Sequence, residues 1–242
     1  TTEIYTLSLH DALPISGLAH EIKNPLSTIG LNAQLLAEGI EELSVGEEDQ
    51  RARLLRRLGA LRREVERLKG ILTDFLTYAG ELRLDRKPDD LRRLIEELVD
   101  FYIPQAQQQG VLLRFDAPPA AVTVDIDAAH IKQAVLNLML NATQAMKAAS
   151  SPTKELMLRL TVRTEADRRS AAVIHVIDTG PGITPEVRER LFQPYFTTKA
   201  SGTGLGLATS RRIAEAHGGS IELATEPGKG SDFQIILPIS PD

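Results

Sequence analysis

The chain contains no cysteine and no tryptophan, and only 4% of its 242 residues are aromatic. Without cysteine it can form no disulfide and no thiolate metal site, which fits a reducing, cytoplasmic setting. Its formal net charge is −5, so it lacks the positive charge that would favour a nucleic-acid partner. No apolar run approaches the ~20 residues that span a bilayer. We therefore expect no membrane segment within this chain.

Residues 1–16 fit poorly with the sequence that follows them. Apolar and polar residues alternate there, and Pro14 should interrupt a helix. We interpret this segment as a non-native leader. A short native linker from an absent upstream domain remains an alternative.

Two long amphipathic helices are expected within residues 17–80, joined by a turn over residues 44–49. The apolar stripe of the first helix comprises Leu18, Ile22, Leu26, Ile29, Ala33, Leu36, Ile40 and Leu43. That of the second has heptad spacing and comprises Leu54, Leu58, Leu61, Val65, Leu68, Leu72, Phe75 and Ala79. Because two helices cannot bury both stripes, we predict a dimeric four-helix bundle. A monomeric hairpin packed on the next domain is the alternative.

A second domain is predicted over residues 89–242, after a charged linker at residues 81–88. Asp89 or Asp90 should cap a first helix that runs to about Gln109. The other expected helices cover residues 128–149 and 205–217, with a short one from Pro185. The expected strands cover residues 111–115, 122–124, 156–164, 172–177, 220–225 and 232–237. This pattern predicts an α/β sandwich with helices on one face of a sheet, and an α+β fold for the whole chain.

The most informative segment is residues 17–26, Gly-Leu-Ala-His-Glu-Ile-Lys-Asn-Pro-Leu. A neutral imidazole is a competent nucleophile toward a phosphoryl group if a neighbour accepts its proton, and His20 is followed directly by Glu21. Asn24 lies one helical turn beyond His20 on the same face, and Pro25 should bend the helix. We interpret the other histidines as ordinary surface or core residues.

Two further motifs lie in the second domain. Asn137 and Asn141 are four residues apart and share a helical face, although two such amides could also serve as polar surface. Asp178-Thr-Gly-Pro-Gly182 follows an apolar strand. Its carboxylate could accept a hydrogen bond from an exocyclic amine, and Gly180 and Gly182 would let the backbone approach a flat ring. Alone, this motif could be any turn.

A short lid is expected over residues 191–193 and 195–199, ahead of Gly202. Phe192 should anchor its base, and Lys199 could reach a phosphate. The glycine-rich motif that follows comprises Gly202, Thr203, Gly204, Leu205 and Gly206. It opens a helix, and helix N-termini bind phosphate readily. The spacing is not that of a dinucleotide fingerprint, and the lysine of a P-loop is missing.

In their order, these motifs resemble those of the catalytic core of two-component sensor histidine kinases, over roughly residues 17–240. The resemblance implies that His20 is the phosphoacceptor, that Glu21 is its base, and that Asn24 orients a water in a phosphatase reaction. It also implies that Asn141 is a Mg²⁺ ligand supported by Asn137.

The resemblance further implies that Asp178 reads the adenine amino group while the glycine-rich lid covers the phosphates. ATP and Mg²⁺ are thus the expected cofactors. The expected partners are a second copy, bound through the hairpin, and a response-regulator receiver domain that docks near Ile29 and Leu72. The chain would be cytoplasmic, or the cytoplasmic part of a membrane-bound sensor. Tyr195 departs from the family's usual phenylalanine but keeps the ring.

Other functions remain open. A gyrase-type or chaperone-type ATPase, or an anti-sigma-type serine kinase, would share the nucleotide motifs but would not need the motif around His20. A non-catalytic nucleotide-sensing dimer is disfavoured because His20, Glu21 and Asn141 are all intact. Phosphatase activity through Asn24 could also dominate.

Overall fold

The computed structural model describes residues 9–41, 48–80, 82–149, 153–164, 170–199 and 202–239. The chain divides into two compact units. The first is Thr1–Gly80 with Pro194–Leu205, and the second is Glu81–Gln193 with Gly206–Asp242.

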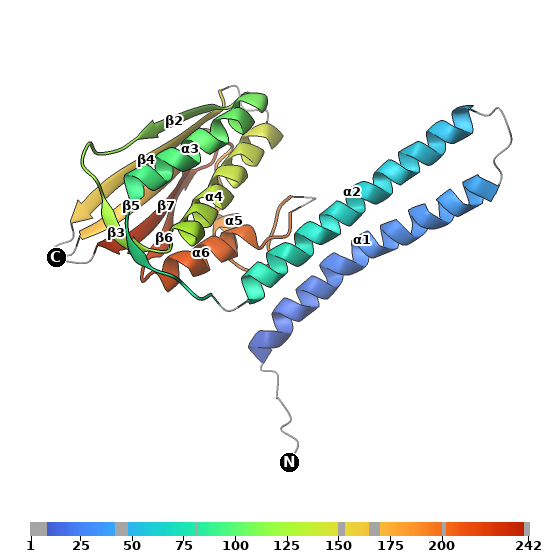
Figure 1. The fold of residues 1–242 in the computed structure, drawn as a ribbon, viewed down its shortest axis with the longest axis horizontal. Coiled ribbons are helices and arrows are strands. Elements are labelled where there is room, and N and C mark those ends of the chain that lie inside the picture. Colours follow the sequence, from blue (N-terminus) through green and yellow to red (C-terminus); the bar gives the residue numbers. More distant parts are fainter. Residues whose placement is uncertain are drawn as a thin grey trace, which may run out of the picture. The chain divides into compact units, whose positions relative to one another are not determined.

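The first unit is built on the two expected long helices, α1 (Leu9–Glu41) and α2 (Glu48–Ala79), which lie antiparallel and side by side (Figure 1). The guanidinium of Arg57 on α2 donates to the Leu35 carbonyl on α1. Helix α1 continues through Pro14, so the prediction that this proline interrupts the helix was wrong. Proline removes only one backbone donor, and here the helix continues past it without a break. Residues 44–47 of the expected turn lie outside the described residues.

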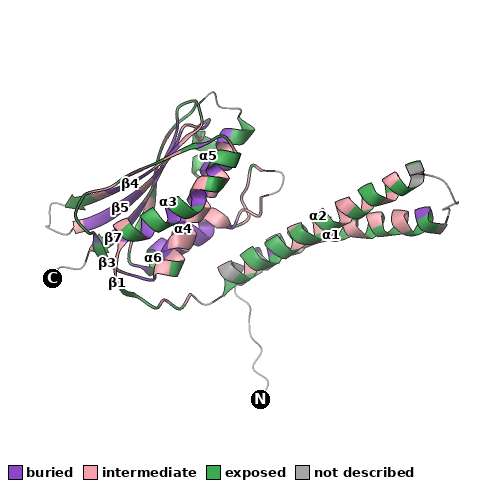
Figure 2. Cartoon of the chain, turned by 45° about the horizontal axis from the view of Figure 1, so that its top comes forward, coloured by how far each residue is buried: buried purple, intermediate pink, exposed green. Residues whose placement is uncertain are grey.

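The hairpin leaves much of its predicted apolar stripe uncovered. Leu58, Val65 and Leu72 are 47%, 45% and 44% exposed, and Figure 2 shows mostly exposed and intermediate residues along both helices. Ile71, which the heptad pattern does not include, is instead only 2% exposed. The exposed stripe is the surface that a bundle with a second copy would cover.

The described residues of the second unit form eleven elements. They are β1 (Lys87–Asp90), α3 (Leu91–Gln108), β2 (Leu112–Asp116), β3 (Thr123–Ile126), α4 (Ala128–Ala148), β4 (Glu155–Thr164), β5 (Ser170–Asp178), α5 (Pro185–Arg188), α6 (Gly206–Ala216), β6 (Ser220–Glu226) and β7 (Gly230–Ile239). Asp90 caps α3, since its carboxylate accepts the Arg92 N–H at 3.1 Å. This confirms the capping prediction.

The five-stranded sheet has the order β2-β4-β5-β7-β6, with only the β2–β4 pair parallel. Helices α3, α4 and α6 cover one face of it (Figure 1). Alternating side chains of β4, among them Leu156 and Leu158, are fully buried. The α+β fold with a one-sided sandwich is therefore as predicted.

A separate two-stranded sheet pairs β1 with β3. Lys87 and Pro88 pair with Ile126 and Asp125, so a strand begins inside the segment interpreted as the linker 81–88. The sequence around Pro88 shows no strand pattern, because the pairing depends on β3 rather than on local propensity.

Candidate active site

Helix α4 carries the two predicted asparagines. Ile131, Leu138 and Met139 of this helix are fully buried, whereas Asn137 and Asn141 are half-buried on another face. The Asn137 side-chain amide donates to the Gly206 carbonyl at 3.3 Å. Asn137 thus holds the start of α6, at the last glycine of the predicted phosphate loop.

A second bond joins α4 to α6 further along. The Ser210 hydroxyl lies 3.2 Å from the Ala134 carbonyl and 3.0 Å from that of Gly206. Ser210 is fully buried. The two helices therefore form one hydrogen-bonded pair, and the first turn of α6 is fixed relative to Asn137.

Asp178 ends β5 and is only 5% exposed. Its Oδ1 accepts the Gly180 N–H at 2.7 Å, and a Cβ at Gly180 would lie 2.6 Å from the same oxygen. Burial raises the pKa of Asp178 to about 6, although hydrogen bonds from the Gly180 and Ser231 backbone lower it in part. Met146 of α4 lies against this turn, since the Thr179 hydroxyl is 3.5 Å from its Sδ. The carboxylate therefore lies beside α4, ready to accept a hydrogen bond.

The lid residues Pro194–Leu205 belong to the hairpin unit. The Thr203 hydroxyl donates to the Asp74 carboxylate of α2 at 2.8 Å. Tyr195 has a φ of 64°, which is unusual for a residue with a side chain. Burial lowers the pKa of Lys199, which remains a candidate phosphate ligand together with Gly202, Gly204 and Leu205.

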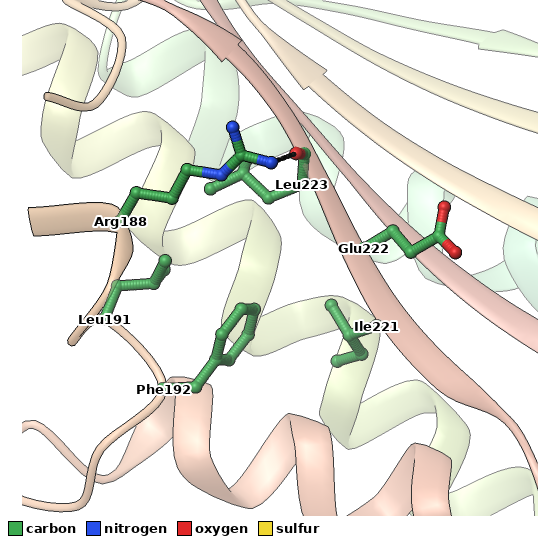
Figure 3. Close-up of a pocket in the computed structure, with 6 residues that line it drawn as sticks. All are labelled: Arg188, Leu191, Phe192, Ile221, Glu222 and Leu223. Carbon is green, nitrogen blue, oxygen red and sulfur yellow. Dashed lines mark hydrogen bonds between the residues drawn. The ribbon is translucent and has the colours of Figure 1, made fainter. Parts of the chain in front are cut away.

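Phe192 has a clear packing role. Its ring meets that of Phe233 edge-on, with centroids 6.5 Å apart, and the Arg211 guanidinium lies 5.8 Å from its centroid. It also lines a pocket of about 340 Å³ with Arg188, Leu191, Ile221, Glu222 and Leu223 (Figure 3). The Arg188 guanidinium there donates to the Leu223 carbonyl at 3.3 Å. No other predicted site residue lines this pocket, which lies at the edge strand β6.

The predicted phosphoacceptor and its base lie on α1. The side chains of His20 and Glu21 are outside the described residues. Asn24 is exposed, and Pro25 beside it is buried. An exposed amide one turn from His20 is accessible to a partner protein.

A metal ion at this site would need ligands from the bound nucleotide as well as from the protein. In the described ranges, no three or more His, Cys, Asp or Glu side chains are grouped so as to hold a metal ion. The side-chain oxygen of Asn141 is of the hard type that Mg²⁺ prefers. Within the same ranges no helix is both long and apolar enough to cross a membrane.

Two family models match the chain, one in its N-terminal part and one in its C-terminal part. The His Kinase A (phospho-acceptor) domain matches residues 15–80, and the histidine kinase-, DNA gyrase B- and HSP90-like ATPase matches residues 126–241. The chain belongs to the two-component histidine kinases. The first model contains His20 and the second contains Asn141 and Asp178.

Named relatives agree with this family assignment. The chain is 36% identical to the sensor histidine kinase ZraS of Klebsiella oxytoca over 93% of its own length and 45% of that protein. It is 30% identical to the kinase/phosphatase NtrB of Vibrio alginolyticus, over 94% of the chain and 62% of the relative. The structure of histidine kinase ThkA in complex with response regulator TrrA matches 94% of this chain and 61% of that one, with a TM-score of 0.70 and 26% identity. The chain thus spans about half the length of several curated relatives.

Sequence reasoning missed two residues that organise this histidine kinase core. Asp127 and His217 are both buried and hydrogen-bonded to each other, at the N-terminus of α4 and just after α6. His217 was interpreted as an ordinary residue. Its partner lies 90 positions away in the sequence, so no local pattern could have revealed it.

Proposed function

We propose that this chain transfers the γ-phosphoryl group of ATP to His20 and then to an aspartate of a response-regulator receiver domain. One observation carries the proposal: a helical hairpin bearing the His20 motif precedes a domain in which Asn137 is bonded to the glycine-rich loop at Gly206. An ATPase of another class would need the second feature but not the first.

ATP binding would use the surface formed by α4, the Asp178 turn and the start of α6. Asp178 accepts the adenine amino group, and Gly180 and Gly182 let the backbone lie close to the ring. Backbone N–H groups at the start of α6 face the phosphates, with Lys199 and Thr203 of the lid as further ligands. Asn141 would hold Mg²⁺, which neutralises phosphate charge when bound.

Phosphoryl transfer to His20 would depend mainly on positioning and charge neutralisation. The His20 nitrogen attacks the γ-phosphorus as the bond to the β-γ bridging oxygen breaks, and ADP leaves. Glu21 orients the imidazole and accepts its proton. In this first transfer, His20 is the only residue of the chain that forms a covalent bond to the phosphoryl group.

The partners are inferred from relatives and from the hairpin. ThkA is described in complex with a response regulator, and we expect an equivalent receiver domain to dock on the hairpin near Ile29 and Leu72. We expect a second copy to cover the exposed stripe through Leu58 and Val65. This kinase core would act in the cytoplasm.

Transfer to a receiver domain tests the proposal beyond autophosphorylation. The chain is first labelled with γ-labelled ATP and Mg²⁺, freed of nucleotide, and mixed with purified receiver domains. The label should move to one receiver within seconds to minutes and not to its Asp→Asn variant. A chain that labels itself but passes the label to no receiver would contradict the second half of the proposal.

A phosphatase reaction is the second candidate, and the exposure of Asn24 supports it. Its amide could orient a water toward the phosphorylated aspartate of a docked receiver. NtrB, a relative, is named as both kinase and phosphatase. Asn24→Ala should slow dephosphorylation of a phosphorylated receiver while autophosphorylation continues. If dephosphorylation is unchanged, Asn24 has no such role.

A further inference from the structure

Helices α4 and α6 of the ATPase domain lie side by side, and hydrogen bonds join them at both ends of α6 and in its middle (Figure 1). Asn137 of α4 holds Gly206, the first residue of α6, and Ser210 reaches α4 one turn further on. Directly after the last residue of α6, Nε2 of His217 accepts the backbone N–H of Asp127 at 2.9 Å. The end of α6 is therefore fixed to the start of α4.

The two end bonds fix the position of α6 along α4. Asp127 directly precedes α4, and Asn137 lies about 15 Å further along the helix axis. Gly206 and His217 are separated by about 16 Å along α6. Because these spans match and the helices run in opposite directions, both bonds form together at one register. A slide of α6 along its axis would break both.

The His217 ring is held at both of its nitrogens. A backbone N–H can only donate, so Nε2 carries no proton, and the Nδ1–H donates to the Ile213 carbonyl at 2.8 Å. Burial lowers the pKa of His217, although the bond to Ile213 raises it in part. The ring is 1% exposed and stays neutral near neutral pH. It also satisfies the Asp127 N–H, which has no partner within α4 because it precedes the first turn.

The register of α6 matters because α4 also positions the other end of the proposed ATP site. The turn after Asp178 lies against Met146, near the C-terminal end of α4, with the Thr179 hydroxyl 3.5 Å from its Sδ. The backbone N–H groups that would meet the phosphates lie at the start of α6. ATP has to reach both places at once. A shift of α6 on α4 would therefore move the phosphate end of the site away from the adenine end.

We propose that His217 is a positioning residue for ATP: by bonding the start of α4, it fixes the register of α6 and so the place of its phosphate-binding first turn. The inference rests on the proposed ATP-binding function. Without this bond, α6 spends part of its time at shifted positions. The apparent dissociation constant for ATP then rises by the reciprocal of the fraction that is still correctly placed.

Two amide substitutions separate the roles of the two ring nitrogens. In His217→Asn, the side-chain NH₂ can donate to the Ile213 carbonyl as Nδ1 does, but the side chain is too short to reach the Asp127 N–H. In His217→Gln, the longer side chain can accept that N–H through its oxygen. Tyr102→Phe is the control for general loosening, because it removes a buried hydroxyl that donates to Thr143 at 3.0 Å between α3 and α4.

The test measures ATP binding by calorimetry, the melting temperature, and hydrogen exchange of residues 206–217 in the full chain, at a temperature where every variant is folded. His217→Asn should raise the dissociation constant at least about fivefold and speed exchange in α6, and saturating ATP should slow that exchange again. His217→Gln should stay within about twofold of the parent. Tyr102→Phe should lower the melting temperature and leave ATP binding and α6 exchange unchanged.

The inference is overturned if His217→Asn melts at a lower temperature but binds ATP as the parent does, because a merely structural role predicts that result. It is also overturned if Tyr102→Phe weakens ATP binding equally, or if His217→Gln binds as weakly as His217→Asn.

Two further outcomes are distinguishable. If His217→Asn does not fold, Ser210→Ala takes its place, because it removes the middle bond and should raise the dissociation constant about twofold. An unchanged constant there would show that the register of α6 does not govern ATP binding. If the parent chain binds no ATP, the proposed function fails, whereas exchange in α6 still shows whether His217 sets its register.

Discussion

The Asn137 amide donates to the Gly206 carbonyl at 3.3 Å, and this bond links two motifs that lie 69 positions apart in the chain. Asn137 therefore holds the start of α6, at the end of the predicted phosphate loop. This role differs from that of Asn141, whose oxygen is proposed to bind the metal ion.

Asn137→Ala should weaken ATP binding by loosening the first turn of α6. A hydrogen bond between neutral groups contributes about 1 kcal/mol, so we expect a dissociation constant about five- to tenfold higher by calorimetry. Lys147→Ala, an exposed change near the end of the same helix, is the control and should leave the constant unchanged. Equal affinities in both variants would refute the role given to Asn137.

ATP affinity should depend on the ionisation of Asp178. Its carboxyl group accepts the adenine amine more strongly when it is deprotonated, and its pKa is about 6. Affinity should therefore fall as the pH drops through about 6. ATP titrates in the same range, so Asp178→Asn provides the control: its affinity should be lower and should show only the pH dependence of ATP. Parallel pH profiles for the two proteins would contradict the prediction.

The effect of pH on folding stability through Asp178 has the opposite sign to its effect on ATP affinity. The pKa of Asp178 is higher in the folded chain than its ordinary value of 3.8, so between these values the folded state binds more protons than the unfolded state. Its contribution to stability should therefore be greatest below about pH 4 and should be lost as the pH rises through about 6. Urea unfolding of the parent and of Asp178→Asn across this range would measure it.

Gly182→Ala should destabilise the ATPase domain much more than Gly228→Ala. Both glycines have positive φ, +68° and +83°, which costs an alanine about 1–2 kcal/mol. At Gly182 the new Cβ would also clash with the Glu226 carbonyl, whereas at Gly228 nothing lies within 4 Å. Urea unfolding should show the Gly182 variant to be the less stable by at least about 2 kcal/mol. Equal losses would show that the backbone at Gly182 can shift.

Val65→Lys should weaken dimerisation. Val65 lies in the exposed heptad stripe, and covering a charged side chain there is costly in free energy. We expect at least about a tenfold rise in the dimer dissociation constant by sedimentation equilibrium. Glu66→Lys is the control: it places a lysine at the next position, on the polar face of the helix, and should change the dimer dissociation constant little. If the dimer dissociation constant of Val65→Lys is unchanged, the dimer interface does not include Val65.

Local patterns in the sequence predicted most of the elements of this chain. The heptads located α2, Asp89 or Asp90 was expected as the cap that Asp90 provides, and strand-like apolar runs located β4 and β5. Contacts between distant residues could not be predicted. Lys87 pairs with Ile126, and Asp127 bonds His217, yet neither residue of either pair carries a local signal for the other.

The same limit applied to the active site. Asn141 and Asp178 were proposed from their motifs and remain predictions, whereas the position of Asn137 against Gly206 emerged only from the packing of α4 on α6. The burial of Ile71 was likewise missed, because a heptad pattern describes one stripe of one helix.

The most direct test of the account is the chemical nature of the phosphorylated residue. The chain is incubated with γ-labelled ATP and Mg²⁺ beside a His20→Gln variant, and the label is challenged with acid and with alkali. We predict a label that acid removes, that alkali leaves in place, and that is absent from His20→Gln. A label that survives the substitution, or one that is stable in acid, would contradict the assignment of His20 as the phosphoacceptor.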